Sequence, residues 1–127
     1  MAWATFLVGN SSVGRKEFDE AGGFDPDFKT WGFEHFELAF RLQRLGVKFL
    51  SRPGIMSYHI PHSRENGYYQ SMIESSCELI KTKYPEHPFE LLRDFLFGKV
   101  SLQDFEMGFS KKVTANLINQ DPVFFNI

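Results

Sequence analysis

Apolar side chains recur at helical spacing over residues 34–45. They form two sets, Leu38, Leu42 and Leu45 at i, i+4 and i+7, and Phe36 and Phe40 at i and i+4. Positions that repeat every three or four residues lie on one face of a helix, which here would face a core. Glu37 and Arg41 stand four apart and predict a structural ion pair on that helix. Gly46 ends the pattern, so the sequence predicts a helix over 34–45.

Other segments also predict helices. Residues 15–21 are polar helix formers stopped by two glycines, and residues 69–83 carry apolar positions at helical spacing. Pro88 suits the first turn of a helix closed by Gly98. Ser101 and Asp104 resemble a capping box before a last helix that reaches about residue 117. The second half of the chain is therefore predicted to be mostly helical.

Three short segments predict strands, because they are rich in aromatic and β-branched residues. They are residues 3–8, 47–50 and 55–60, and the first reads as a buried strand. We therefore predict an α/β (α+β) fold of short strands plus helices. Residues 1–63 would form one part, and residues 64–127 a helical C-terminal extension packed on it.

Composition narrows the class of protein. The 127 residues suit one compact domain, and the net charge of −2 and scattered basic residues argue against nucleic-acid binding. The lone cysteine, Cys77, permits no internal disulfide and is predicted to be a small buried residue on a helix. No apolar run reaches the roughly 18 residues that span a bilayer. We expect a cytoplasmic protein. Peripheral attachment to a membrane, through a further part of the protein, is the alternative.

Three motifs carry the candidate chemistry. The first is GNSSV at residues 9–13 followed by GGFD at 22–25, the second is WGFEHFELAFRL at 31–42, and the third is YHIPH at 58–62. In this order and spacing they resemble the C-terminal, acceptor-side region of GT-A glycosyltransferases, in the galactosyltransferase and chondroitin-polymerase-like group of family-2-type enzymes. The resemblance covers about half of the chain. It implies transfer of a hexosyl or N-acetylhexosaminyl unit from a nucleotide-diphosphate sugar to a glycan acceptor.

The resemblance also implies a divalent metal, Mn²⁺ or Mg²⁺, held against the diphosphate of the donor. His59 stands where this family places a histidine ligand at a strand end, and His62 is the alternative. A neutral imidazole is a suitable ligand for Mn²⁺, which stabilises charge on the leaving diphosphate. Without the family pattern, His59 would be read as a loop histidine that forms hydrogen bonds.

Glu34 and His35 occupy the positions where the family has Glu-Asp, with the Asp as general base and both residues at the acceptor hydroxyls. This chain departs from the pattern, because His35 replaces the Asp. Imidazole can accept a proton near neutral pH. Whether Glu34 or His35 is the base stays open from sequence, and Glu34 could instead simply complement the helix dipole.

Five more residues are predicted around the acceptor: Asn10, Phe24, Asp25, Trp31 and Gly32. A sugar face of C–H groups stacks on an indole, and a glycine lets a loop approach closely. Asn10 and Asp25 can bond hydroxyls, although both residue types also build turns. Trp31 could equally anchor its loop in the core.

The metal-binding Asp-x-Asp motif of such enzymes does not precede the Gly-Asn-Ser motif, and Asp25-Pro26-Asp27 lies downstream of the expected place. We therefore expect that the chain lacks a donor-binding half and is inactive without it. The alternative is a non-catalytic carbohydrate-binding or interaction module derived from the same fold. A metal-dependent hydrolase using His59 and His62 is a third reading, which no third ligand at a recognisable spacing supports.

Self-association is a further expectation from the predicted strand over residues 3–8. Without a neighbouring strand, its backbone groups and the phenylalanines around it would be exposed. This predicts a homo-oligomer, such as a dimer, built through that sheet edge.

Overall fold

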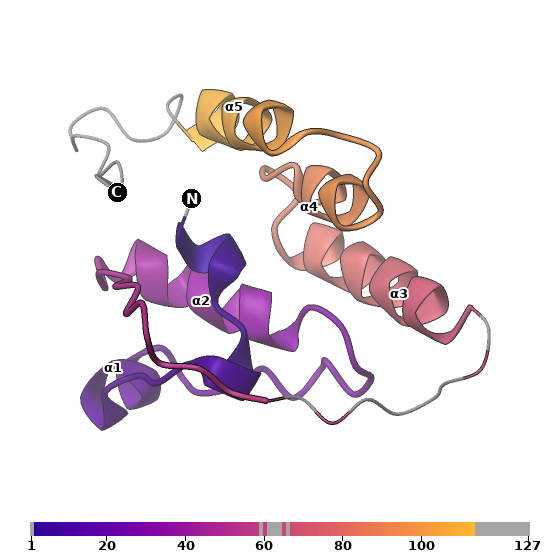
Figure 1. Ribbon diagram of the computed structural model, residues 1–127. Helices are drawn as coiled ribbons and strands as arrows, with labels where there is room; N and C mark the ends of the chain where they lie inside the picture. Colours follow the sequence, from indigo (N-terminus) through magenta and orange to yellow (C-terminus); the bar gives the residue numbers. More distant parts are fainter. Residues whose placement is uncertain (1, 59, 61–64, 66, 114–127) are drawn as a thin grey trace.

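The computed structural model describes residues 2–58, 60, 65 and 67–113. It begins with two short 3₁₀ helices, η1 and η2, and continues with α-helices α1 to α5. Their bounds are η1 Ala2–Thr5, η2 Val8–Asn10, α1 Arg15–Glu20, α2 Glu34–Arg44, α3 Tyr68–Lys83, α4 Phe89–Leu96 and α5 Leu102–Val113. Helix η1 packs on α2, α3 packs on α4, and α4 packs on α5 (Figure 1).

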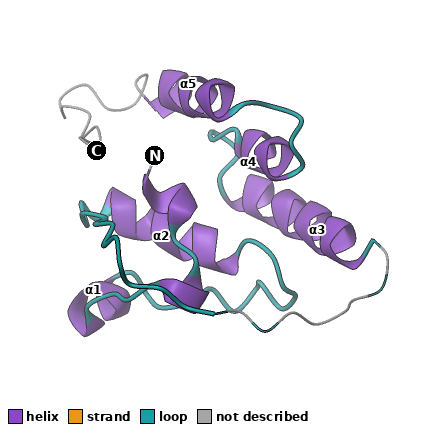
Figure 2. Cartoon of the chain, viewed as in Figure 1, coloured by secondary structure: helices purple, strands orange, loops and turns teal. Residues whose placement is uncertain are grey.

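The predicted α/β fold is wrong for the part of the chain that is described, which contains helices and loops but no strand (Figure 2). Residues 3–5 belong to η1, residues 6–7 link it to η2, which begins at Val8, and residues 47–50 and the described residues of 55–60 are loop. A strand needs a neighbour for its backbone groups, and no described segment pairs with any of these three. A short apolar run does not distinguish a strand from a buried helical turn.

The helices agree closely with the sequence pattern. Helix α2 covers nearly all of the predicted range and ends at Arg44, two residues before Gly46, whose φ of 80° suits glycine. The Ser101 hydroxyl accepts a hydrogen bond from the Asp104 N–H at 3.1 Å and donates one to its carboxylate at 2.7 Å. This confirms the capping interaction at the start of α5, whose predicted end beyond residue 113 lies outside the described residues.

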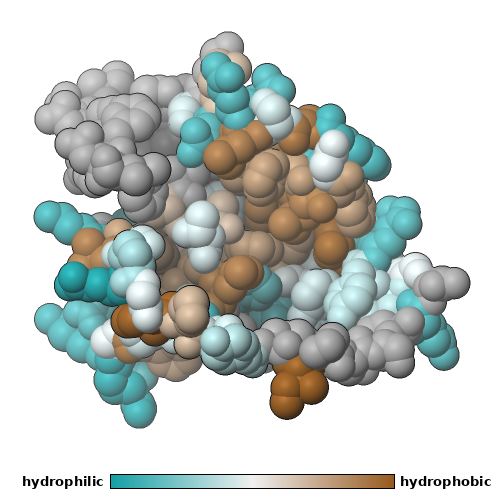
Figure 3. Space-filling view, in the orientation of Figure 1, coloured by the Kyte–Doolittle hydropathy of each residue, from teal (hydrophilic) through white to brown (hydrophobic). Residues whose placement is uncertain are grey.

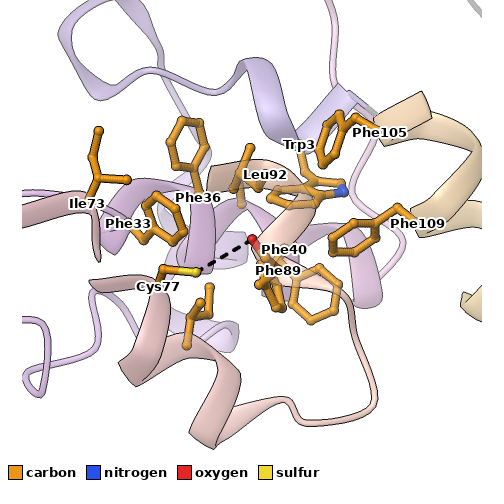
Figure 4. Close-up of a cluster of buried hydrophobic side chains, with 12 residues drawn as sticks. Trp3, Phe33, Phe36, Phe40, Ile73, Cys77, Phe89, Leu92, Phe105 and Phe109 are labelled. Atoms are coloured by element: carbon orange, nitrogen blue, oxygen red, sulfur yellow. Dashed lines mark hydrogen bonds between the residues drawn. The ribbon is translucent and has the colours of Figure 1, made fainter. Parts of the chain in front are cut away.

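The core is centred on Trp3, which is 1% exposed. Four aromatic rings from three helices surround its indole, with centroids 5.3–6.4 Å away (Figure 4). They are Phe40 of α2, Phe89 of α4, and Phe105 and Phe109 of α5. The first residues of the chain therefore hold the last two helices against α2.

Cys77 confirms its predicted place as a buried residue on a helix. Its Sγ lies 3.8 Å from the Phe89 carbonyl oxygen, which links α3 to α4 (Figure 4). Burial raises the pKa of the thiol to about 11, so it stays protonated and unreactive at neutral pH.

Glu37 is fully buried and holds three segments together. It accepts hydrogen bonds from Arg41 at 2.7 and 2.6 Å, which confirms the predicted pair, and from the Tyr84 hydroxyl at 2.5 Å. Arg41 also donates to the carbonyls of Ala21 and Gly23. The turn after α1 and the end of α3 are thereby fixed to α2. Burial raises the pKa of Tyr84 to about 12, and the hydrogen bond to Glu37 contributes to the same shift.

The loop between α2 and α3 exposes large apolar side chains. Each of Leu50, Ile55, Met56, Tyr58 and Ile60 is at least 66% exposed. Figure 3 shows apolar surface over α3 to α5 and separate apolar spots along the loop at the lower edge. The sheet edge that predicted self-association is not formed by residues 3–8, because they form no strand and bury Trp3. Within the described ranges, no helix has the length and apolar character needed to cross a bilayer.

Candidate functional site at the start of α2

The loop before α2 lies directly on α3. A Cβ on Gly32 would stand 2.2 Å from the Ser76 Oγ and 2.8 Å from its Cβ, so only glycine fits. Ser76 is 2% exposed, and its hydroxyl has no hydrogen-bond partner. The neighbour that Gly32 approaches is therefore a helix of the chain itself, and its role at the acceptor stays a prediction.

Glu34 begins α2 and keeps part of its side chain in solvent. One carboxylate oxygen accepts a hydrogen bond from the Gly32 N–H at 2.8 Å. The other lies 3.5 Å from Nδ1 of His35. The side chain is 25% exposed, so the carboxylate can still reach a molecule outside the protein. Its position in the first turn also favours its negative charge.

His35 is buried behind Glu34. Only 6% of the residue is exposed, and neither ring nitrogen has a hydrogen-bond partner. Its ring lies 4.1 Å from that of Phe36. Burial lowers the pKa of His35 and outweighs the opposing influence of the nearby Glu34 carboxylate. His35 is therefore neutral at physiological pH and has no open path to an external hydroxyl.

Trp31 is 45% exposed and does not anchor its loop in the core. Its indole meets the ring of Tyr69 edge-to-face, with centroids 4.9 Å apart and an interplanar angle of 68°. Tyr69 belongs to α3 and is itself 43% exposed. The sequence pattern placed Tyr69 on an apolar helix face, and nothing in that pattern pointed to a contact with Trp31.

Asp25 is engaged in contacts within the protein. Its carboxylate lies 2.9 Å from Lys83 and accepts a hydrogen bond from the Asp27 N–H at 2.9 Å. Burial would raise the pKa of Asp25, but the bonds from Lys83 and Asp27 and the charge of Arg41 together lower it. Lys83 also contacts Asp27 at 2.6 Å, so Asp25 joins the turn after α1 to the end of α3.

Phe24 and Asn10 lie on the surface of the first half of the chain. Phe24 is 46% exposed and packs edge-to-face on Phe18 of α1, at 5.7 Å. The Asn10 side-chain amide donates to the carbonyl of Ile55 at 3.5 Å. No contact in the structure joins either of them to Trp31 or Glu34, so their acceptor-binding role stays a prediction.

The predicted metal ligands, His59 and His62, lie outside the described residues. Among the residues that are described, no three His, Cys, Asp or Glu side chains gather in a way that could hold a metal ion. The described side chains therefore do not themselves form a metal centre.

A separate surface cavity lies between the end of α3 and α4. Its lining consists of Lys81, Pro85, His87, Glu90 and Arg93. Its two strongest cations are paired already, Lys81 with Glu78 at 2.9 Å and Arg93 with Asp94 at 2.8 Å. None of the predicted site residues lines this cavity.

Comparison with known proteins relates the chain to glycosyltransferases. Residues 1–63 match a family described as the N-terminal domain of galactosyltransferase. An uncharacterized glycosyltransferase of Bacillus subtilis is 40% identical over 62 residues, which is 49% of this chain and 16% of the relative. The first half of this chain is thus related to glycosyltransferases.

Two further relatives are a glucosyltransferase and a chondroitin synthase. The validoxylamine A glucosyltransferase of Streptomyces hygroscopicus subsp. jinggangensis is 32% identical over 85 residues, or 67% of this chain and 20% of that protein. The chondroitin synthase of Escherichia coli is 42% identical over 62 residues, which is 48% of this chain and 9% of that protein. The match spans a fifth or less of each of these relatives. No solved structure matches. The predicted C-terminal placement within a glycosyltransferase is not confirmed.

Proposed function

We propose that this chain is the acceptor-binding part of a GT-A-type glycosyltransferase, which moves a hexosyl or N-acetylhexosaminyl unit from a nucleotide-diphosphate sugar to a glycan. The observation that carries the proposal is the arrangement at the start of α2. There a partly exposed carboxylate, Glu34, is positioned by the Gly32 N–H beside the half-exposed Trp31. The relationship of residues 1–63 to glycosyltransferases supports this reading.

Within this proposal, Glu34 is the general base. The acceptor hydroxyl oxygen bonds to the anomeric carbon as the bond to the diphosphate breaks, and Glu34 takes the hydroxyl proton. A single displacement of this kind inverts the anomeric configuration. His35 is a positioning residue, because both its nitrogens are buried while Glu34 is 25% exposed. A neutral imidazole behind Glu34 leaves the carboxylate without a competing salt bridge.

Donor binding and metal dependence require groups beyond the described residues. His59 would contribute one ligand to Mn²⁺ or Mg²⁺, which would neutralise the diphosphate, and a further donor-binding part would contribute the others. The exposed apolar side chains of the α2–α3 loop include Tyr58 and Ile60 on either side of His59, and they are suited to contact such a part. We infer that the chain transfers sugar only when this part is supplied.

The proposal is tested by a chimera. In the E. coli chondroitin synthase, the matched 62-residue segment is replaced by the corresponding segment of this chain. Labelled sugar from a panel of UDP-hexoses and UDP-N-acetylhexosamines is then followed into chondroitin oligosaccharides. Transfer by the chimera is expected, whereas a folded chimera without transfer would contradict the proposal. The isolated chain, assayed in parallel, should not transfer.

The alternative is a non-catalytic glycan-binding module. It is favoured by His35, which stands where the resembling enzymes have a carboxylate. A module of this kind would bind glycan without metal, and its chimera would be inactive whichever residue stood at position 34.

A further inference from the structure

Two aromatic rings from distant parts of the chain meet at the surface beside Glu34. Trp31 and Tyr69 are each a little under half exposed. The other tryptophan of the chain, Trp3, is by contrast only 1% exposed. The Tyr68 ring lies 5.4 Å from Tyr69, so the aromatic surface continues along the start of α3. Large rings that remain half in water have apolar faces available for a ligand.

The packing of the loop fixes where these rings stand. Gly32, next to Trp31, lies so close to Ser76 that no side chain fits between them. Ser76 and Tyr69 both belong to α3, so the loop and the Tyr69 ring are carried on one rigid element. The buried Ser76 hydroxyl has no hydrogen-bond partner, which lowers the stability of the fold at this contact. A platform held in this way loses little freedom when it binds.

We propose that Tyr69 and Trp31 form one stacking platform for a pyranose ring of the acceptor glycan, so that α3 forms part of the acceptor site. The C–H face of a pyranose packs on aromatic rings, and its hydroxyls donate to a nearby carboxylate. Glu34 supplies that carboxylate two residues after Gly32. This inference rests on the proposed function, and it gives Tyr69 a role that the sequence pattern did not indicate.

The two tryptophans provide the assay. Acrylamide quenches exposed indoles, so in the full chain it reports on Trp31 while the buried Trp3 contributes a constant background. The Trp31→Phe variant measures that background. The probes are chitin oligosaccharides, which are neutral, and unsulfated chondroitin oligosaccharides, which are anionic. Saturable protection of Trp31 by at least one of them is expected, without added metal.

The decisive variants are Tyr69→Leu, which keeps an apolar side chain but removes the ring, and Tyr69→Phe, which keeps the ring. Tyr69→Leu should weaken glycan affinity about two- to tenfold, and Tyr69→Phe should leave it nearly unchanged. Leu102→Ser is a matched control, because Leu102 is a 54% exposed side chain on α5. The glycan affinity of Leu102→Ser should equal that of the wild type. Thermal melts establish that each variant is folded.

Two outcomes would overturn the platform. One is wild-type affinity in folded Tyr69→Leu, which would remove Tyr69 from the site while leaving the transferase proposal intact. The other is that neither glycan protects Trp31 in the wild-type chain. The chimera's transfer activity is measured separately, so failure of the platform and failure of the proposed function give different results.

Discussion

The two tryptophans of this chain stand in opposite surroundings. Trp3 is enclosed by four aromatic rings from α2, α4 and α5, whereas Trp31 keeps 45% of its surface exposed and touches one ring, Tyr69. The Trp3 region buries apolar surface and contains no candidate chemistry. In the Trp31 region, the Glu34 carboxylate accepts a hydrogen bond from the N–H of Gly32, the residue directly after the exposed indole. The comparison separates residues that hold the fold from residues that are free to bind.

The largest expected effect is at Trp3. Trp3→Ala should lower the free energy of unfolding by about 3–5 kcal/mol, because it leaves a large cavity between three helices. Trp31→Ala should change it by about 1 kcal/mol or less, since its site is half exposed. Urea denaturation followed by circular dichroism measures both. Equal losses at the two positions would break the comparison.

The next effect concerns two glutamates three residues apart. Glu37→Gln removes the buried charge that Arg41 and Tyr84 bind, and should cost about 1.5–3 kcal/mol of stability. Glu34→Gln should cost well below that, because Glu34 is partly exposed and accepts one backbone bond. The same urea titration compares them. A larger loss at Glu34 than at Glu37 would show that Glu34 is chiefly structural.

Gly32→Ala should have a smaller effect on stability, about 1–2 kcal/mol, because its Cβ would clash with Ser76. It should also alter acrylamide quenching of Trp31, since the loop must move away from α3. The double variant with Ser76→Gly relieves the clash and should recover part of the loss in a double-mutant cycle. Additive losses would mean that the loop does not rest on α3 in solution.

The smallest effect is a pH dependence. The pKa of His35 is lowered below 6.5 in the folded chain, so the unfolded chain binds more protons between these two values. Stability should therefore fall as pH drops through 6.5 toward the folded pKa, and be fully present above 6.5. His35→Gln should remove this part of the pH dependence of the free energy of unfolding. Unfolding titrations across this window compare the variant with wild type, and equal slopes would place His35 in water.

Local signals in the sequence predicted the helices well. The helical apolar spacing over 34–45, the glycine after it and the serine cap of α5 all depend on neighbours within one or two turns, and each is confirmed. The Glu37–Arg41 pair is confirmed for the same reason. Such interactions are decided by spacing along the chain, which a sequence displays directly.

The errors arose where structure depends on distant neighbours. An aromatic run at residues 3–8 fits a strand or a buried turn equally well, and the rings of α4 and α5 decide in favour of helix. The contact of Trp31 with Tyr69 and the bond from Tyr84 to Glu37 likewise join residues far apart in sequence. The sequence does not decide between Glu34 and His35 as the base, and their different burial distinguishes them.

The central claim is that Glu34, and not the buried His35, receives the acceptor proton. The most direct test is kcat for transfer by the chimera carrying Glu34→Gln or His35→Gln. The account predicts that Glu34→Gln lowers kcat about 10²–10⁴-fold with a much smaller change in the acceptor KM, and that His35→Gln lowers it less than about tenfold. Undiminished kcat in Glu34→Gln, or a loss of that size confined to His35→Gln, would contradict it.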